Sequence, residues 1–135
     1  MSPGWNINRI KRLLFISVEC HPHYPQRRLS RFCSAQGIHL QAYSSLGTTT
    51  SNSPLLVDPK VLRLAEKYSK SPAQILLRWG LDSGFSVLPK STNEQHIREN
   101  FDLFDFELDK EEVESVCFKE GEEASKYAWN PNVVL

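Results

Sequence analysis

Three short apolar runs alternate with helix-like segments along this chain. The runs span Leu13 to Val18, Ile38 to Tyr43 and Phe85 to Leu88, and turn or cap residues follow each of them. Their short length and nearly continuous apolar character favour buried strands. Strands that alternate with helices build a parallel sheet covered by helices, so the sequence predicts an α/β fold.

Helix start and stop signals lie between the runs. A proline follows Asp58, another follows Ser71, and Gln74 is placed for a capping box with Ser71. Five helices are predicted. The first covers residues 27–36, the second begins at Pro59 and the third at Pro72. The fourth covers residues 94–101, and the fifth runs from Asp109 to near Gly121. The expected apolar faces are Val61, Leu62, Ala65 and Tyr68 on the second helix, and Ile75, Leu76 and Trp79 on the third.

Composition and charge narrow the possible partners. At 135 residues, 40% of them hydrophobic, the chain can form one ordinary domain with a core. Sixteen basic and sixteen acidic residues cancel, which argues against nucleic acid and anionic membranes. No apolar run approaches the length of a membrane span, so we expect no membrane partner. Cys20, Cys33 and Cys117 are few and odd in number, which indicates reduced thiols and a cytoplasmic protein.

In parallel α/β folds, functional groups gather beyond the carboxyl ends of the strands. This rule selects the polar residues that follow the three apolar runs. They are Glu19 and His21, Tyr43 and Ser44, and Lys90 and Ser91. The sequence predicts that one rim of the sheet collects all of them.

Lys90 and Ser91 stand directly before a helix start. Thr92 or Asn93 can cap that helix, and Gln95 is placed for a capping box on Thr92. Free N–H groups and the helix dipole favour an anion there, so one interpretation is a phosphate site. The other is a solvated turn, because lysine is common at strand ends.

Two further groups near the rim have competing interpretations. The Tyr43 ring can stack on a planar ligand or fill the core. Cys20, His21 and His23 resemble a metal patch, but a second ligand pair at a usable spacing is missing from the sequence, so we predict no metal site.

Two pairings in the first half of the chain also need an interpretation. Glu19 beside Arg27 or Arg28 suits a structural ion pair better than a catalytic one. Cys33 with His39 could form a nucleophilic pair, but no third residue is identifiable that would orient the imidazole. We therefore predict a structural role for Glu19 and no nucleophilic role for the pair of Cys33 and His39.

Five blocks, in order, resemble the carboxyl-terminal half of the aldo-keto reductases. The blocks are "VECHPHYPQ" from Val18, "QAYSSLG" from Gln41, "SPAQILLRWGLDSG" from Ser71, "VLPKSTNEQHIREN" from Val87 and "FDLFDFELDKEE" from Phe101. With "KYAWNP" near the tail, the resemblance covers about residues 18–131. It implies a partial (β/α)8 TIM barrel, made of the last three β/α units plus the C-terminal helix and tail. We expect residues 1–11 to be a divergent N-terminal segment and residues 12–135 a partial aldo-keto reductase domain.

The resemblance also implies a cofactor and a reaction. The family binds a nicotinamide dinucleotide, usually NADPH, and reduces small-molecule aldehydes and ketones to alcohols. By position, Tyr43 corresponds to the ring that stacks on the nicotinamide. The other implied contacts are Ser44, Leu46 and Thr48 along the pyrophosphate, Lys90, Ser91, Thr92 and Asn93 around the ribose 2′-phosphate, and Glu99 and Asn100 at the adenine.

Two positions depart from the family pattern. His96 stands where the family has an arginine over the adenine and 2′-phosphate. An imidazole is mostly neutral at pH 7 and cannot bind phosphate through two parallel hydrogen bonds, so NADP preference should be weakened. Ile16 and Ser17 replace an Asn-Gln pair whose glutamine binds the nicotinamide carboxamide, which puts the orientation of the nicotinamide in doubt.

The catalytic Asp, Tyr, Lys and His of the family belong to the first half of the barrel. The four tyrosines of this chain lie outside the matching context, so we assign no catalytic residue. We expect a truncated oxidoreductase polypeptide that is inactive alone. The alternative is a non-catalytic module for nucleotide binding or protein interaction. Exposed edges of a partial sheet also favour self-association.

Overall fold

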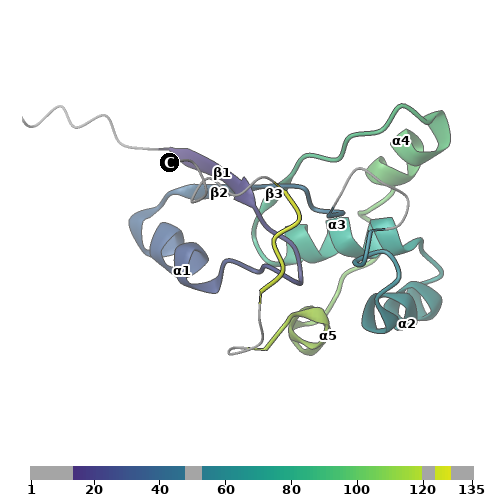
Figure 1. Cartoon of the computed structure of the whole chain (residues 1–135). Helices are drawn as coiled ribbons and strands as arrows, with labels where there is room; N and C mark the ends of the chain where they lie inside the picture. Colours follow the sequence, from purple (N-terminus) through teal and green to yellow (C-terminus); the bar gives the residue numbers. More distant parts are fainter. Residues whose placement is uncertain (1–13, 48–52, 120–123, 129–135) are drawn as a thin grey trace, which may run out of the picture.

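The computed structural model describes residues 14–47, 53–119 and 124–128. Within them, three parallel strands form one sheet in the order β1-β2-β3 (Figure 1). The strands are β1 (Phe15–Glu19), β2 (His39–Tyr43) and β3 (Ser86–Val87). The predicted α/β fold with a parallel sheet is confirmed, although each strand is shorter than its apolar run.

The two faces of the sheet differ in polarity. Strand pairing aligns Val18 with Ala42 and Ser17 with Gln41. Because side chains alternate along a strand, the two pairs lie on opposite faces. Val18 and Ala42 pack in the core, whereas Ser17 is exposed. The strands are therefore buried mainly on one face.

The described residues also form five helices. They are α1 (Arg27–Gln36), α2 (Pro59–Tyr68), α3 (Pro72–Asp82), α4 (Glu94–Phe101) and α5 (Lys110–Val116). Helices α1 and α3 contact the sheet, while α2 packs against α3 and α5 (Figure 1). The predicted cap of α2 by Asp58 forms, and so does the capping box of Ser71 and Gln74 on α3. None of the described helices combines the length and the hydropathy that a membrane crossing requires.

Two local predictions are wrong. Leu62 is exposed on α2, and Leu64 is buried in its place, because Leu64 shares the inner face of the helix with the predicted residues Val61 and Ala65, whereas Leu62 lies at its edge. Helix α5 ends at Val116 rather than near Gly121. The chain leaves the helix there because the N–H of Phe118 donates to a carbonyl in the loop after β1 at 3.0 Å.

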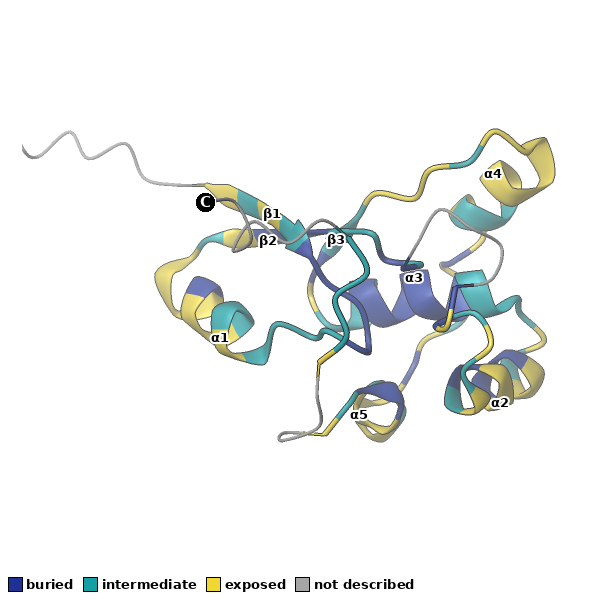
Figure 2. Cartoon of the chain, in the orientation of Figure 1, coloured by how far each residue is buried: buried dark blue, intermediate teal, exposed yellow. Residues whose placement is uncertain are grey.

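The core is centred on α3, which is the most deeply buried helix of the described chain (Figure 2). Its predicted apolar residues Ile75, Leu76 and Trp79 are all buried. Gly80 lets α3 approach β3 closely, because a side chain at this position would meet a methyl group of Val87 at 2.6 Å. The short strand β3 is thereby held against the core.

Candidate functional site

The chain leaves β2 in a tight turn at the carboxyl end of the sheet. Ser44 has a positive φ of 51°, and its carbonyl accepts the N–H of Gly47 at 2.8 Å. Gly47 has a φ of 84°, and a side chain there would meet Ser53 Oγ at 2.4 Å. The Ser53 hydroxyl donates to the carbonyl of Leu46 at 2.6 Å, which fixes Leu46 beyond the strand end.

A second turn leads from β3 into α4. Asn93 caps α4 by accepting the N–H of His96 at 3.2 Å, and the Ser91 hydroxyl accepts the N–H of Asn93 at 3.0 Å. The predicted capping box between Thr92 and Gln95 is wrong, because the Gln95 side-chain amide donates one turn ahead along α4. The turn before α4 is thus held by its own side chains.

Buried polar side chains of α3 fix the other end of α4. The Gln74 amide donates to the carbonyl of Asp102 at 3.0 Å, and Arg78 Nη1 donates to the carbonyl of Leu103 at 3.0 Å. Both side chains come from the helix at the centre of the core. The position of α4 relative to the strand ends is therefore set by the core.

A pocket of about 280 Å³ lies between the two turns and the start of α3. Its lining is Leu46, Leu56, Ser71, Pro72, Ala73, Lys90, Ser91, His96, Glu99 and Asn100. Six of these are residues that the sequence pointed to as cofactor contacts: Leu46, Lys90, Ser91, His96, Glu99 and Asn100. The pocket combines apolar walls with one ammonium group, one imidazole and one carboxylate.

The other expected contact residues lie beside this pocket in the chain but do not line it. Tyr43 is half-buried at the end of β2, and Ser44 follows it in the turn. Thr92 is exposed, and the side chain of Asn93 is engaged as the helix cap. Thr48 lies outside the described residues.

Glu19 ends β1 and is buried among hydrogen-bond donors. The donors are Lys126 Nζ at 2.9 Å, His21 Nε2 at 2.9 Å, and the backbone N–H groups of Tyr127 and Ala128 at 2.5 and 3.1 Å. The predicted pairing of Glu19 with Arg27 or Arg28 is wrong, since Arg27 pairs with Glu114 at 2.9 Å. A structural role for Glu19 fits these contacts, because four donors already engage the carboxylate.

The electrostatics of this cluster favour an ionised carboxylate and a neutral imidazole. Burial by itself would raise the pKa of Glu19, but hydrogen bonds from Lys126, His21 and the tail backbone outweigh it and lower the pKa. Burial lowers the pKa of His21 in spite of the neighbouring carboxylate. The His21 Nε2–H therefore donates to Glu19, and Nδ1 is a buried atom without a hydrogen-bond partner in the described part of the chain.

His23 is engaged at both ring nitrogens. Its Nε2 lies 2.7 Å from Asp58 Oδ2, and its Nδ1 lies 2.8 Å from the Tyr127 hydroxyl.

Burial raises the pKa of the neighbouring Cys20 thiol to about 12, so the thiol stays protonated. Among residues 14–47, 53–119 and 124–128, no group of three or more ligating side chains could hold a metal ion.

The Cys33 and His39 pair does not form a nucleophilic site. The His39 imidazole lies 2.6 Å from the Ser86 hydroxyl, on the polar face of the sheet. Cys33 is buried on α1 among core residues. Both side chains are thus accounted for by the fold.

The model of the Aldo/keto reductase family matches residues 6–117 of the chain. The chain belongs to the aldo/keto reductase family. This aldo/keto reductase chain is 50% identical over 97 residues to "Aldo-keto reductase family 4 member C11" of Arabidopsis thaliana. The match covers 70% of the chain and 31% of that relative. It is 45% identical over 106 residues to the human "Aldo-keto reductase family 1 member C1". That match covers 73% of the chain and 33% of the relative.

A solved structure shares the fold of this aldo/keto reductase chain. The aldose reductase from Schistosoma japonicum matches 76% of the chain and 32% of its own length, with a TM-score of 0.68 and 35% identity. The aldo/keto reductase chain spans about a third of the length of the curated relatives it matches. The family predicted from the five sequence blocks is confirmed.

Four residues of the aldo/keto reductase pocket were missed by the sequence interpretation. They are Leu56, Ser71, Pro72 and Ala73. Ser71 and Pro72 were recognised as the start of a helix. A local start signal does not show which strand ends, distant in the sequence, that helix lies against. Leu56 follows a polar loop, and no local pattern marks it as a contact residue.

Proposed function

We propose that this chain binds the adenosine end of a nicotinamide dinucleotide, NADPH above all, in the pocket between the ends of β2 and β3 and the start of α4. The pocket supports this proposal because Leu46 and five residues between 90 and 100 line one cavity. These are the positions that the family resemblance relates to the pyrophosphate, the 2′-phosphate and the adenine.

The residues of the pocket suit a nucleotide phosphate. Lys90 is exposed, and within the described residues its ammonium group pairs with no carboxylate, so its charge is available to an anion. The first turn of α4 adds backbone N–H groups and the positive end of the helix dipole. Leu46, Leu56 and Pro72 give apolar walls of the kind that a purine ring requires.

His96 should make the pocket weakly selective for a 2′-phosphate. Its imidazole lines the pocket but lacks the fixed positive charge and the paired donors of a guanidinium. We therefore expect NADPH and NADH to bind with affinities closer to each other than an arginine would allow. The change His96→Arg should raise the affinity for NADPH about fivefold and leave that for NADH nearly unchanged.

Isothermal titration calorimetry with NADPH tests the binding proposal. The change Lys90→Gln should weaken binding about five- to twentyfold, because it removes a charged phosphate contact. Lys60→Gln is the matched control, since Lys60 lies on α2 outside the pocket lining. Equal affinity in the two variants, or no heat with NADPH at millimolar concentration, would reject the proposal.

We further propose that the chain alone does not turn over carbonyl substrates. In the family a tyrosine with a lowered pKa donates the proton, whereas here a hydrogen bond to Glu112 raises the pKa of Tyr68. The Tyr127 hydroxyl is engaged by His23. NADPH oxidation with 4-nitrobenzaldehyde should match the enzyme-free blank, and a measurable rate would overturn this part.

We also propose that residues 12–135 form three adjacent units of a (β/α)8 barrel. The parallel order β1-β2-β3 and the helices on one face of the sheet support this arrangement. In a barrel, the polar face that carries Ser17 and Gln41 would point inward. A crystal structure tests this arrangement. Further parallel strands that extend both edges of the sheet would support it, and a second sheet packed against the polar face would contradict it.

A further inference from the structure

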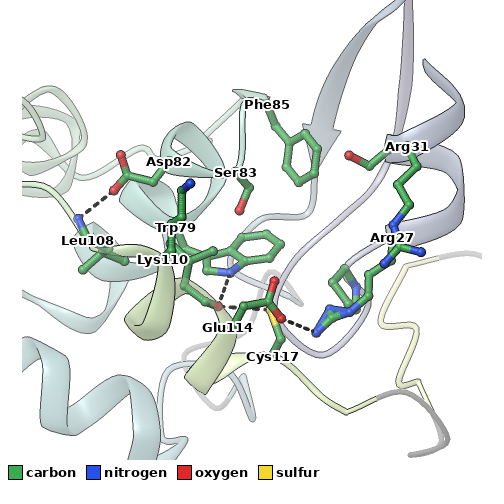
Figure 3. Close-up of a pocket in the computed structure, with 13 residues that line it drawn as sticks. Arg27, Arg31, Trp79, Asp82, Ser83, Phe85, Leu108, Lys110, Glu114 and Cys117 are labelled. Carbon is green, nitrogen blue, oxygen red and sulfur yellow. Dashed lines mark hydrogen bonds and ion pairs between the residues drawn. The ribbon is translucent and has the colours of Figure 1, made fainter. Parts of the chain in front are cut away.

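A second and larger pocket lies away from the proposed cofactor pocket. Its volume is about 580 Å³, and it is formed by α1, α5 and the segment that joins α3 to β3. The two pockets share no lining residue. Figure 3 shows Arg27 and Arg31 of α1 on one side of it, and Trp79 and Lys110 on the other.

The floor of the second pocket is apolar and well ordered by packing. Trp79 and Phe85 are 2% and 7% exposed, and their ring centroids lie 5.9 Å apart in an edge-to-face arrangement. The Trp79 indole N–H already donates to the carbonyl of Val113 at 3.1 Å. The small part of the indole that reaches the pocket lining is therefore apolar and carries no unpaired donor.

The acidic side chains of the second pocket are already neutralised. Asp82 accepts hydrogen bonds from Arg78 at 2.9 Å and from the N–H of Leu108 at 2.8 Å. Glu114 pairs with Arg27 at 2.9 Å. The carboxylates of the lining thus hold no free negative charge toward a ligand.

Two cations of the lining are left over. Within the described part of the chain, no carboxylate pairs with Arg31 on α1 or with Lys110 at the start of α5. Both side chains are exposed, Arg31 on the α1 side of the pocket and Lys110 on the α5 side (Figure 3). The pocket therefore combines an aromatic base with net positive charge at its mouth, which is complementary to an apolar monoanion.

We propose that this second pocket binds a small carboxylate with a flat aromatic body. The aromatic body lies toward Trp79 and Phe85, and the positive charges of Arg31 and Lys110, on opposite sides of the mouth, attract the carboxylate. The volume of about 580 Å³ lies within the range of small-molecule sites and accepts a fused two-ring compound. The site is independent of the proposed nucleotide function, because none of its residues touches the first pocket.

Titration with 2-naphthoate, followed by the ¹H–¹⁵N signal of the Trp79 indole, tests the proposal on the full chain. The signal should shift to saturation, and the uncharged analogue 2-naphthamide should shift it with weaker affinity. Arg31→Gln and Lys110→Gln should each weaken naphthoate binding up to about fivefold. Neither change should alter naphthamide binding. Arg28→Gln, an exposed arginine of the same helix outside the lining, is the matched control and should leave both affinities unchanged.

A filling variant separates this site from the first pocket. Ser30 lines the second pocket from α1, so Ser30→Phe should abolish the naphthoate shift and leave NADPH binding intact. Three results would overturn the proposal: equal affinity for naphthoate and naphthamide, equal effects of the three charge variants, or an indole signal unmoved at 10-millimolar naphthoate, a concentration of the order at which weak sites fill.

Discussion

Lys126 Nζ lies 2.9 Å from Glu19 Oε2, although the two residues are 107 positions apart in the chain. The contact ties the segment at 124–128 to the carboxyl end of β1. The Glu19 carboxylate is fully buried, and the backbone N–H groups of Tyr127 and Ala128 also donate to it. This cluster joins residues 126–128 to the carboxyl end of the sheet.

The change Glu19→Gln should destabilise the chain by about 2–4 kcal/mol. The variant leaves the ammonium group of Lys126 without its buried partner and points an amide N–H toward backbone donors. Urea denaturation at pH 7 measures the effect. Glu107→Gln is the control, because Glu107 is 84% exposed and lies 3.7 Å from Arg78, so its loss should cost below about 0.5 kcal/mol. Equal midpoints for the two variants would contradict the structural role of Glu19.

Stability should fall as the pH is lowered from 7 to 4. Burial lowers the pKa of His21 below its ordinary 6.5. Below pH 6.5 the unfolded chain therefore binds a proton more readily than the folded chain does, which favours unfolding. The hydrogen bonds of Glu19 lower its pKa below 4.5, which adds a second loss under that pH. Urea midpoints between pH 4 and 8 measure this dependence. In His21→Asn, the part of the loss between pH 7 and 5 should become smaller, and an unchanged slope would argue against a buried neutral imidazole.

The buried thiols should resist modification by thiol reagents in the folded state. Burial raises the pKa of Cys20 to about 12 and that of Cys117 to about 11, so almost no thiolate exists at pH 7.5. Ellman's reagent should titrate these thiols only after urea is added. Above pH 9 the unfolded chain loses thiol protons that the folded chain retains, so stability should decline with rising pH. Rapid labelling of folded chain at pH 7.5 would contradict the burial of these residues.

The open edges of the sheet should make the chain self-associate. Within the described residues, β1 and β3 each pair on one side only, and Leu14 and Phe15 beside the β1 edge are 73% and 56% exposed. Unpaired strand edges with apolar side chains recruit further strands. Sedimentation velocity should show a mass that rises with concentration, and Phe15→Lys should shift it toward the monomer. A strictly monomeric wild-type chain at 100-micromolar concentration, of the order at which strand edges meet, would refute this prediction.

Features set by neighbouring residues were predictable from the sequence. Asp58 and Ser71 cap helices because their side chains reach N–H groups two or three positions on, and such contacts need no knowledge of the fold. The order of the apolar runs likewise determined a parallel sheet, since crossover helices separate them. The grouping of Lys90 with Leu46 in one pocket was implied by the family resemblance rather than by the strand-end rule, which had selected Lys90 but not Leu46.

Features set by distant residues were not predictable. Glu19 pairs with Lys126 rather than with Arg27, because the tail folds back over the strand end, and no local spacing encodes that path. Thr92 and Asn93 are equally good caps by residue type, and only the turn geometry after β3 selects Asn93. The second pocket combines α1 with α5, whose relative position depends on the whole core.

Amide chemical-shift mapping with adenosine 2′,5′-bisphosphate tests the central proposal most directly. This ligand carries the adenosine and the 2′-phosphate of NADPH without the nicotinamide. We expect saturable shifts at residues 71–73 and 90–100, which surround the first pocket. No shifts at millimolar ligand, or shifts confined to Arg31, Trp79 and Lys110 around the second pocket, would contradict it.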